Sequence, residues 1–211
     1  MFTEVNFFEI IVFMHEKYVL ILFASKTGST YALAKSVLRG ANSVPGISGR
    51  LRTVQSVSEL MGKVPVGNQE VPVVTVDDLA GASAVALGSP TQFSNMTSGL
   101  QYFLEQTSGL WMQGALVDKP LTVFTSSASL HGGQETTLMN MITPFLHHGM
   151  VIVGMPYTHP ELSTTTTGGT PYGASHVESP GGVKRDLDAH EHKLAMAQGK
   201  RLASMALKLE A

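Results

Sequence analysis

The stretch LILFASKTGSTYALAKSVLRG, residues 20–40, changes character near its middle. It begins with an unbroken apolar run, which is typical of a central strand buried on both faces. After a short polar loop it continues as a helix that places Leu33 and Val37 on one apolar side. Strand, polar loop and helix in this order form the repeating unit of a parallel α/β sheet.

The polar loop consists of Ser25, Lys26, Thr27, Gly28, Ser29 and Thr30, and it offers hydroxyl groups without any acid or general base. It leads into a helix, whose first turn presents unpaired N–H groups at the positive end of the helix dipole. Helix starts of this kind bind phosphate. The loop is neither a Walker A loop nor a dinucleotide fingerprint, because it holds a single glycine and no Gly-Lys-Ser/Thr sequence. We therefore predict a phosphate site, with a capped helix start that binds nothing as the alternative.

The same pattern recurs twice along the chain. The apolar segment ASAVALG leads into SPTQFSNM and a helix over 97–106, and a strand at 121–124 leads into SSASLHGGQE and a helix over 133–147. The remaining elements are a short strand at 51–54, an irregular segment at 56–76, a strand in MVIVGMP at 150–156 and a last helix at 186–208.

These units predict one α/β domain, a doubly wound parallel sheet of five strands with helices on both faces. In such sheets ligands bind at the carboxyl ends of the strands. The three polar loops are therefore expected to converge on one edge of the sheet. The segment 156–182, rich in Thr, Gly and Pro, is long for a simple connection, so we expect a functional or interface role for it.

Residues 1–17 are predicted to be an extension outside the fold, and residues 18–211 to be the folded domain. Met14 begins the sequence MHEKYVLILF, which reads as a natural start just before the first strand. The preceding apolar run is short, is interrupted by Glu4 and Glu9 and lacks a basic start, so it makes a poor signal peptide or membrane span. The alternative is an amphipathic element packed on the domain.

The composition is that of a globular protein with few charges: 43% of the residues are hydrophobic, 14% are charged and the formal net charge is -2. Such a chain has no basic field for nucleic acid or anionic lipid, so neither nucleic acid nor stable membrane insertion is expected. The absence of cysteine excludes disulfides, thiolate catalysis and zinc–cysteine sites. It is compatible with a reducing compartment, and we expect a cytoplasmic location.

Two other kinds of site are disfavoured. The serines within 126–129 stand near His131, but no acid is placed to orient the histidine and there is no G-x-S-x-G elbow, which argues against a hydrolase. Neither the adjacent pair at 147–148 nor the HEH sequence at 190–192 has the i, i+4 spacing of a helical metal site. No metal is therefore expected.

The only tryptophan, Trp111, lies in SGLWMQGALVDKP, which reads as a loop before a strand. A lone tryptophan is usually part of the core. The flanking Gly109, Gln113 and Gly114 leave a pocket wall as the other interpretation.

Six motifs, taken together, resemble the WrbA family of flavodoxin-like NAD(P)H:quinone oxidoreductases. They are GSPTQFSNM, FLEQTSGLW, GALVDKP, HGGQETTL, LHHGMVIVG and GGTPYGAS, in the order of the family. The match covers nearly all of the chain from Tyr18 onward. The resemblance implies a flavodoxin-like fold, FMN as cofactor, NADH or NADPH as electron donor, and a homotetramer that reduces quinones by two electrons in a ping-pong sequence.

The resemblance also implies roles for individual residues. Ser25 to Thr30 would hold the FMN phosphate, while Thr91, Gln92 and Phe93, followed by Ser126, Ser127, Ala128, Ser129, Leu130 and His131, would hold the flavin ring. His147 would reach the flavin from a neighbouring subunit, and Trp111 would line the quinone and nicotinamide pocket. No side chain is expected to be catalytic, because the flavin carries the hydride chemistry.

Three positions depart from the family pattern. Thr27 replaces an aromatic residue used against the nicotinamide, Gln92 replaces an arginine and Ser94 replaces a glycine. These changes leave FMN binding intact and bear on nicotinamide binding. The alternatives are a flavodoxin-like electron carrier, which is usually strongly acidic, and a regulatory binding protein without enzymatic activity.

Overall fold

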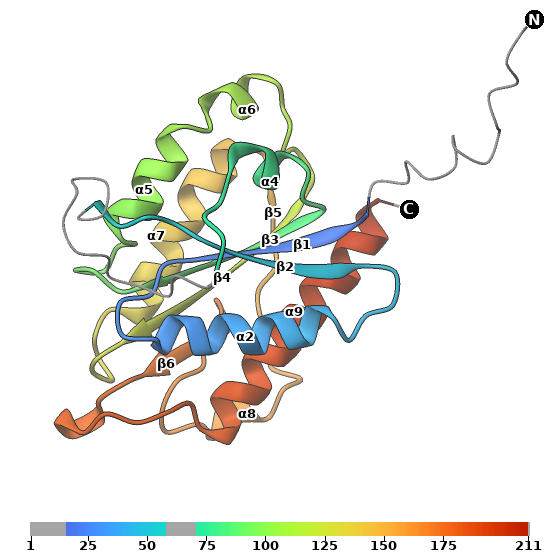
Figure 1. Ribbon diagram of the computed structural model, residues 1–211. Coiled ribbons are helices and arrows are strands. Elements are labelled where there is room, and N and C mark those ends of the chain that lie inside the picture. Colours follow the sequence, from blue (N-terminus) through green and yellow to red (C-terminus); the bar gives the residue numbers. More distant parts are fainter. Residues whose placement is uncertain (1–15, 58–70, 211) are drawn as a thin grey trace, which may run out of the picture.

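The computed structural model describes residues 16–57 and 71–210. In this part of the chain the strands form a parallel sheet in the order β2-β1-β3-β4-β5, and a short sixth strand, β6, also pairs with β4 (Figure 1). The strands are β1 (Tyr18–Phe23), β2 (Ser48–Thr53), β3 (Ala84–Pro90), β4 (Pro120–Ser127), β5 (Val151–Ile152) and β6 (Ser175–Val177). The helices are α2 (Ser29–Ala41), α4 (Val76–Ala80), α5 (Ser98–Glu105), α6 (Ser108–Met112), α7 (Gln134–His147), α8 (Glu161–Thr164), the 3-10 turn η2 (Pro180–Gly182) and α9 (Ala189–Leu209).

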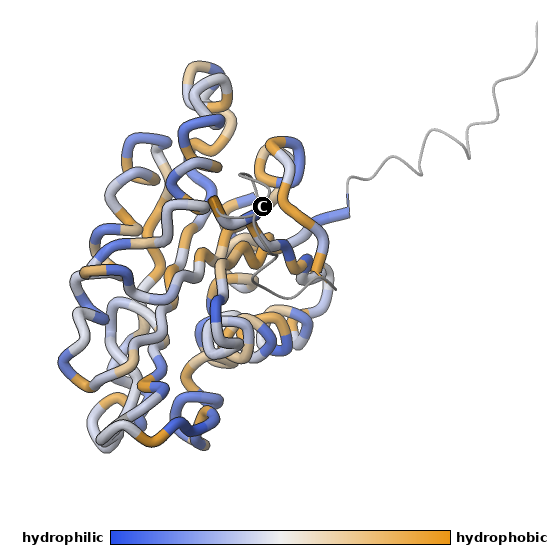
Figure 2. The backbone as a smooth tube through the Cα atoms, turned by 60° about the vertical axis from the view of Figure 1, so that its left-hand side comes forward, coloured by the Kyte–Doolittle hydropathy of each residue, from blue (hydrophilic) through white to orange (hydrophobic). Residues whose placement is uncertain are grey.

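Strand β1 is completely buried and contributes to the core on both faces of the sheet. Leu20 and Leu22 pack with apolar residues of α5 and α7, whereas Val19 and Ile21 pack with those of α2 and α9. Successive strand residues point to opposite faces, so one apolar run can supply two cores. The predicted doubly wound parallel sheet is confirmed, and Figure 2 shows the hydrophobic stretches gathered along its strands.

Helices α2 and α9 pack side by side on one face of the sheet (Figure 1). Their close approach depends on two glycines. A Cβ atom on Gly40 would lie 1.9 Å from the carbonyl oxygen of Met196, and one on Gly199 would lie 2.0 Å from that of Val37. No side chain fits at these distances, so the backbones touch and fix the helix that follows the first polar loop.

The fifth position of the sheet is shared by two short strands. β5 pairs with Pro120 and Leu121 at the start of β4, and β6 pairs with 125–127 at its end. The chain between them leaves the sheet, forms α8 and returns through Gly173, where a Cβ atom would lie 1.9 Å from the carbonyl oxygen of Val123. The predicted strand at 150–156 is therefore shorter than expected, and the segment 156–182 holds the second half of the edge strand.

Several local details differ from the sequence prediction. Strand β2 begins three residues earlier than the predicted strand at 51–54, and the short helices α4 and α6 were not predicted. Helix α4 is closed by a capping box between Thr75 and Asp78. The predicted extension at 1–17 and irregular segment at 56–76 lie largely outside the described residues. Among the residues that the structure describes, no helix has the length and apolar character needed to cross a membrane.

Candidate functional site

The three polar loops meet at the carboxyl edge of the sheet, as the topology predicts. Phe23, Gly88 and Phe124 lie at one level of β1, β3 and β4, so the loops that follow these strands leave the sheet together. The hydroxyl of Thr30 lies 2.8 Å from that of Ser126, and this contact joins the first loop to the third. Nearby, the backbone N–H of Thr91 donates to the carbonyl of Ser126 over 2.8 Å, and this bond joins the second loop to the third.

The first loop ends at a helix start whose N-cap residue has no side chain. Gly28 is the N-cap of α2, with a φ of 97°. The hydroxyl of Ser25 instead accepts from the N–H groups of Gly28 and Tyr31, at 3.2 and 3.3 Å. The first turn contains no acidic residue, whereas α4 and α9 both begin with a capping box that includes a carboxylate. The first turn of α2 thus supplies no carboxylate of its own, and its dipole favours an anion from elsewhere.

The second loop contains a tight turn in a strained conformation. Gln92 and Asn95 exchange backbone hydrogen bonds of 2.8 and 3.0 Å across it. The two residues between them, Phe93 and Ser94, have φ angles of 51° and 64°, which is the left-handed region that favours glycine. The Phe93 side chain is fully exposed. Asn140 of α7 donates to the carbonyl of Ser94 over 2.8 Å and ties the turn to this helix.

The third loop is fixed at its base and open at its tip. Ser127 donates to the carbonyl of Ser129 and accepts from Gln134, both over 2.7 Å, and Gln134 accepts from Ser175 over 2.9 Å. The residues Ala128, Ser129, Leu130 and His131 are exposed. Within the described chain no hydrogen bond links a serine of this loop to His131.

His147 and Trp111 lie far from these loops in a single chain. Helix α7 starts beside the third loop and carries His147 in its last turn, so its 14 residues place His147 about 20 Å from the loop edge. Trp111 was predicted to lie in a loop, but it belongs to the short helix α6, and it is 55% exposed and hence not a core residue. His147 therefore does not reach a ligand at the loop edge of its own chain.

The other histidine of the pair has a structural role. His148 is buried, and its Nε2 lies 3.1 Å from the hydroxyl of Thr107, which ties α7 to the start of α6. Burial lowers the pKa of His148, and the neighbouring His147 lowers it further. A neutral ring in this position can hold the two helices together without the cost of a buried charge.

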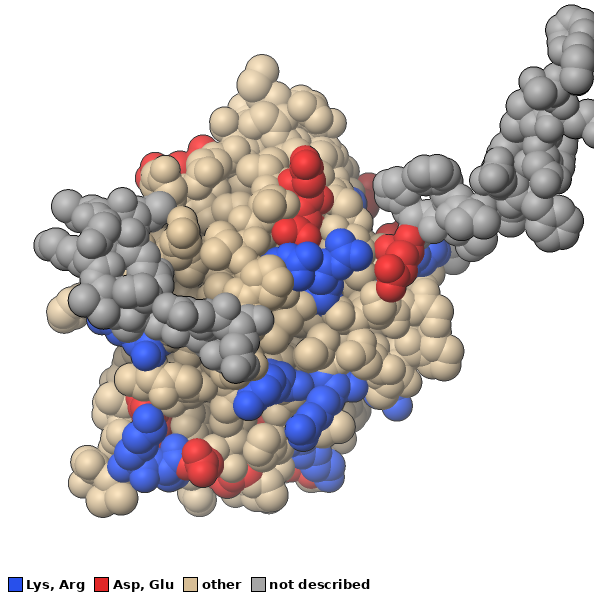
Figure 3. All heavy atoms as spheres, viewed as in Figure 1, with Lys and Arg blue, Asp and Glu red and all other residues tan. Residues whose placement is uncertain are grey.

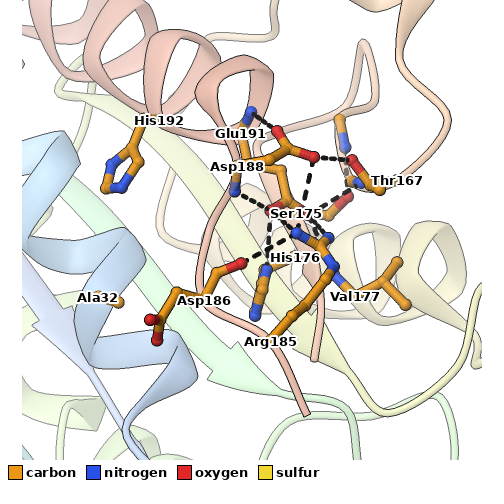
Figure 4. Close-up of polar contacts among 12 residues, drawn as sticks. Ala32, Thr167, Ser175, His176, Val177, Arg185, Asp186, Asp188, Glu191 and His192 are labelled. Carbon is orange, nitrogen blue, oxygen red and sulfur yellow. Dashed lines mark hydrogen bonds and ion pairs between the residues drawn. The ribbon is translucent and has the colours of Figure 1, made fainter. Parts of the chain in front are cut away.

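A buried hydrogen-bond network supports β6 and the segment that follows it (Figure 4). At its centre is Glu191 of α9, which pairs with Arg185 and with His176 Nδ1 at 2.9 Å, and accepts from the backbone N–H groups of Gly168, Val177 and Asp188. Burial raises the pKa of Glu191, but these bonds outweigh burial and lower the pKa to about 2. The network fixes residues 175–188 beside the loop edge.

The structure adds residues to the site that the sequence pattern did not reveal. The hydroxyl of Thr137 on α7 lies 2.7 Å from that of Thr91, and Ser89 accepts from the N–H of Thr97. Glu178 and Lys184, which follow β6, lie beside the first loop. The pairing of β6 with β4 brings them there, and no local motif announces it. In the described chain, no group of three or more His, Asp or Glu side chains is placed to hold a metal ion.

The donor set of this edge fits a phosphorylated aromatic ligand. A helix start with surrounding hydroxyls suits a phosphate, and two loops of small residues suit a flat ring. A model of the family described as NADPH-dependent FMN reductase matches residues 18–159.

The chain belongs to the NADPH-dependent FMN reductase family.

A curated relative, from Geotalea daltonii, carries the name NAD(P)H dehydrogenase (quinone) and is 43% identical over 202 residues, which cover 90% of this chain and 97% of the relative. Among solved structures, a WrbA-like flavodoxin from Agrobacterium tumefaciens has a TM-score of 0.64 at 19% identity and covers 92% of this chain and 99% of that one. An archaeal flavodoxin has a TM-score of 0.58 at 15% identity, with coverage of 92% and 99%. The two structures show the flavodoxin-like fold.

Membership of the FMN reductase family confirms the resemblance that the sequence motifs indicated. It also confirms the expected class, an oxidoreductase, and the expected cofactor, FMN with a reduced nicotinamide nucleotide as co-substrate. The loops at the carboxyl edge are the place in the fold where the residues present fit this cofactor.

Proposed function

We propose that this protein is an FMN-dependent NAD(P)H:quinone oxidoreductase that reduces quinones to hydroquinones by two electrons. The convergence of three small-residue loops on the start of α2 carries the proposal. The name of the Geotalea relative, NAD(P)H dehydrogenase (quinone), supports the quinone as electron acceptor. Bound FMN would supply the hydride chemistry, since the loops offer no acid and base pair of their own.

In this proposal the chain binds and orients the cofactor. Ser25 to Thr30 hold the phosphate at the start of α2, where a Cβ atom on Gly28 would meet nothing within 4 Å. Thr91, Gln92 and Phe93 hold one part of the flavin and Ser126 to His131 hold another. The bond between Thr30 and Ser126 keeps the phosphate loop and the flavin loop at a fixed distance from each other.

Nicotinamide and quinone have to reach the same flavin, so they alternate at one pocket in a ping-pong sequence. The exposed ring of Phe93 and the departures at Thr27 and Gln92 lie on the loops that such a pocket would use. The neutral residues at 27 and 92 leave Lys26 as the only cation in these two loops. Discrimination between NADH and NADPH would then be weak.

A homotetramer belongs to the same proposal. Residues on α5, α6, the following loop, α7 and β5 expose a set of apolar side chains: Tyr102, Trp111, Met112, Val117, Leu146 and Val151. Figure 3 shows mostly uncharged side chains around α6. Burying this surface against another copy would bring Trp111 and His147 to a neighbouring site, which a single chain does not allow. A cytoplasmic location is proposed as well, in keeping with the cysteine-free sequence.

One experiment tests the proposal. The purified protein, loaded with FMN, is mixed anaerobically with NADH or NADPH and then with a quinone, while the visible absorbance of the flavin is followed. Full bleaching by one donor equivalent, and full recovery with one quinone equivalent, is the expected result. Recovery in one-electron steps would favour the electron carrier, and failure to take up FMN would favour the regulatory binding protein.

A further inference from the structure

A carboxylate lies beside the proposed phosphate loop. Glu178 follows β6 directly, and the pairing of β6 with the end of β4 brings it to the loop edge of the sheet. Its side chain is 17% exposed. The first loop contains no acidic residue, so Glu178 is an anion at a place that the helix dipole prepares for one.

Glu178 is tied to the first loop through Lys184. Burial raises the pKa of its carboxyl, but side-chain hydrogen bonds with Thr27, Lys184 and Ser29 outweigh burial and hold the pKa below its usual value. The ammonium group of Lys184 lies 3.3 Å from the carboxylate and also donates to the carbonyl of Thr27 over 3.3 Å. One cation, Lys184, thus joins the carboxylate to the first loop.

The backbone holds Glu178 in this place. Its N–H donates to the carbonyl of Ser127 over 2.8 Å, and its carbonyl accepts from the N–H of Arg185 over 2.8 Å. The N–H of the next residue, Ser179, donates to the carbonyl of Ala128 over 3.1 Å. Arg185 is itself paired with the buried Glu191 (Figure 4). The carboxylate can therefore leave the loop only by rotating its side chain, and it stays close to any phosphate that replaces it.

We propose that Glu178 is a built-in competitor of the flavin phosphate, which competes with it for Lys184 at the first loop and thereby sets the selectivity of the site between phosphorylated and unphosphorylated flavin. The inference rests on the proposed function, because it takes the first loop as the phosphate site. On binding, the phosphate replaces the carboxylate as the partner of Lys184. Repulsion from the displaced carboxylate weakens FMN and leaves riboflavin, which has no phosphate, unaffected.

The test measures flavin affinity rather than activity. Full-length protein freed of flavin is titrated with FMN and with riboflavin, and binding is followed by quenching of flavin fluorescence. Glu178→Gln, which keeps the shape and loses the charge, is expected to bind FMN roughly tenfold more tightly than the unsubstituted protein, with riboflavin affinity unchanged. Lys184→Gln is expected to weaken FMN alone.

Asp186→Asn is the matched control, because it removes one negative charge from the same exposed segment without touching the first loop. It is expected to leave the ratio of FMN to riboflavin affinity unchanged. A second variant, Glu178→Ala, tests the same point without an amide that could donate to the phosphate. Unchanged or weaker FMN binding in both Glu178 variants, with the melting temperature preserved, would overturn the inference.

One further variant distinguishes a failure of this inference from a failure of the proposed function. If Ser25→Ala combined with Thr30→Ala weakens FMN while the Glu178 variants have no effect, the phosphate site stands and the competitor role falls. If the double variant leaves FMN and riboflavin binding as they were, the phosphate lies elsewhere, and both the site assignment and the competitor role fall.

Discussion

The hydroxyls of Thr30 and Ser126 lie 2.8 Å apart, although 96 positions separate the two residues in the chain. Thr30 lies in the first turn of α2, and Ser126 lies near the end of β4, at the carboxyl edge of the sheet. Both side chains are buried. This contact joins the loop that suits a phosphate to the loop that suits a flavin ring, so the spacing between the two parts of the ligand is set by the sheet.

The first prediction concerns the phosphate loop. Replacing Ser25 and Thr30 together by Ala removes the acceptor for the N–H groups of Gly28 and Tyr31 and breaks the contact with Ser126. In the proposed site these two hydroxyls also bond the phosphate. Hydrogen bonds to charged groups contribute about 1.5–3 kcal/mol each, so the loss of both is expected to lower FMN affinity by roughly two orders of magnitude. Riboflavin affinity is expected to change little. Fluorescence titration with both ligands measures the difference.

Ser204→Ala is the control for this variant, since its hydroxyl only bonds the carbonyl of Lys200 within α9. It is expected to leave both affinities unchanged. An equal loss of FMN and riboflavin affinity in the double variant would show that the loop orders the whole site rather than the phosphate.

The convergence of the loops could be predicted from the sequence because it follows from topology. Each strand, loop and helix unit is local, and right-handed crossovers place all carboxyl ends on one edge. The tight packing of α2 on α9 through Gly40 and Gly199 was not predicted, because a glycine within a helix does not reveal its partner. Residues 25–30 alone left two interpretations open, a phosphate site and a capped helix start that binds nothing.

The split edge strand could not be predicted for a physical reason. β5 has two residues and β6 has three, Ser175–Val177, so neither gives the alternation or apolar run that marks a strand. Their pairing depends on β4, which is distant in sequence. Glu178 escaped notice for the same reason, and Trp111 was misplaced because the five residues of α6 are too few for a helical period to appear.

The second prediction concerns backbone strain at Ser94. Its φ of 64° costs a side chain about 1–2 kcal/mol, and glycine adopts this conformation without that cost. Ser94→Gly is expected to raise the free energy of unfolding by about 0.5–1 kcal/mol, as measured by urea denaturation. Ser204→Gly, in the interior of α9, is expected to lower it by about the same amount. A destabilised Ser94→Gly would mean that the serine side chain stabilises the turn more than the strain costs.

The third prediction concerns stability at acid pH. The pKa of Glu191 is lowered from the usual 4.5 to about 2, so the unfolded chain binds a proton more readily than the folded one between these values. The stabilisation is fully present above pH 4.5 and is lost as the pH falls toward 2. It amounts to roughly 3 kcal/mol. Denaturation across this range measures it.

Glu191→Gln is expected to lower stability at neutral pH and to flatten its decline between pH 4.5 and 2, because the titrating group is gone. Glu210→Gln serves as the control, since Glu210 forms a partly exposed ion pair with Lys17 at the surface. That variant is expected to keep the full acid decline. If Glu191→Gln kept it too, other carboxyls would be responsible for it.

The fourth prediction concerns the apolar face of α6, α7 and β5. Leu146 is 57% exposed in the single chain, and Asp at this position would place a charge in the proposed interface. Leu146→Asp is expected to shift size-exclusion elution from tetramer to smaller species and to lower quinone reduction. Met139 is also exposed and lies on an earlier turn of α7, so Met139→Asp controls for the effect of placing a charge on this helix. A monomer with full activity would refute the shared site.

The last prediction concerns Trp111. Its ring is 55% exposed on α6, so its removal leaves no cavity, and the melting temperature of Trp111→Ala is expected to stay within a few degrees of the original. If the ring lines a neighbouring subunit's pocket, it pairs with the nicotinamide or quinone ring, which contributes about 0.5–1.5 kcal/mol beyond area burial. The variant should then retain FMN and lose about tenfold in kcat/KM for quinone. The next residue, Met112, is 80% exposed. Met112→Ala removes apolar surface without removing a ring, so it distinguishes the effect of the ring from that of lost apolar area. Normal quinone kinetics in a Trp111→Ala tetramer would exclude the pocket role, whereas a parallel loss of tetramer and activity in both variants would make Trp111 an interface residue only.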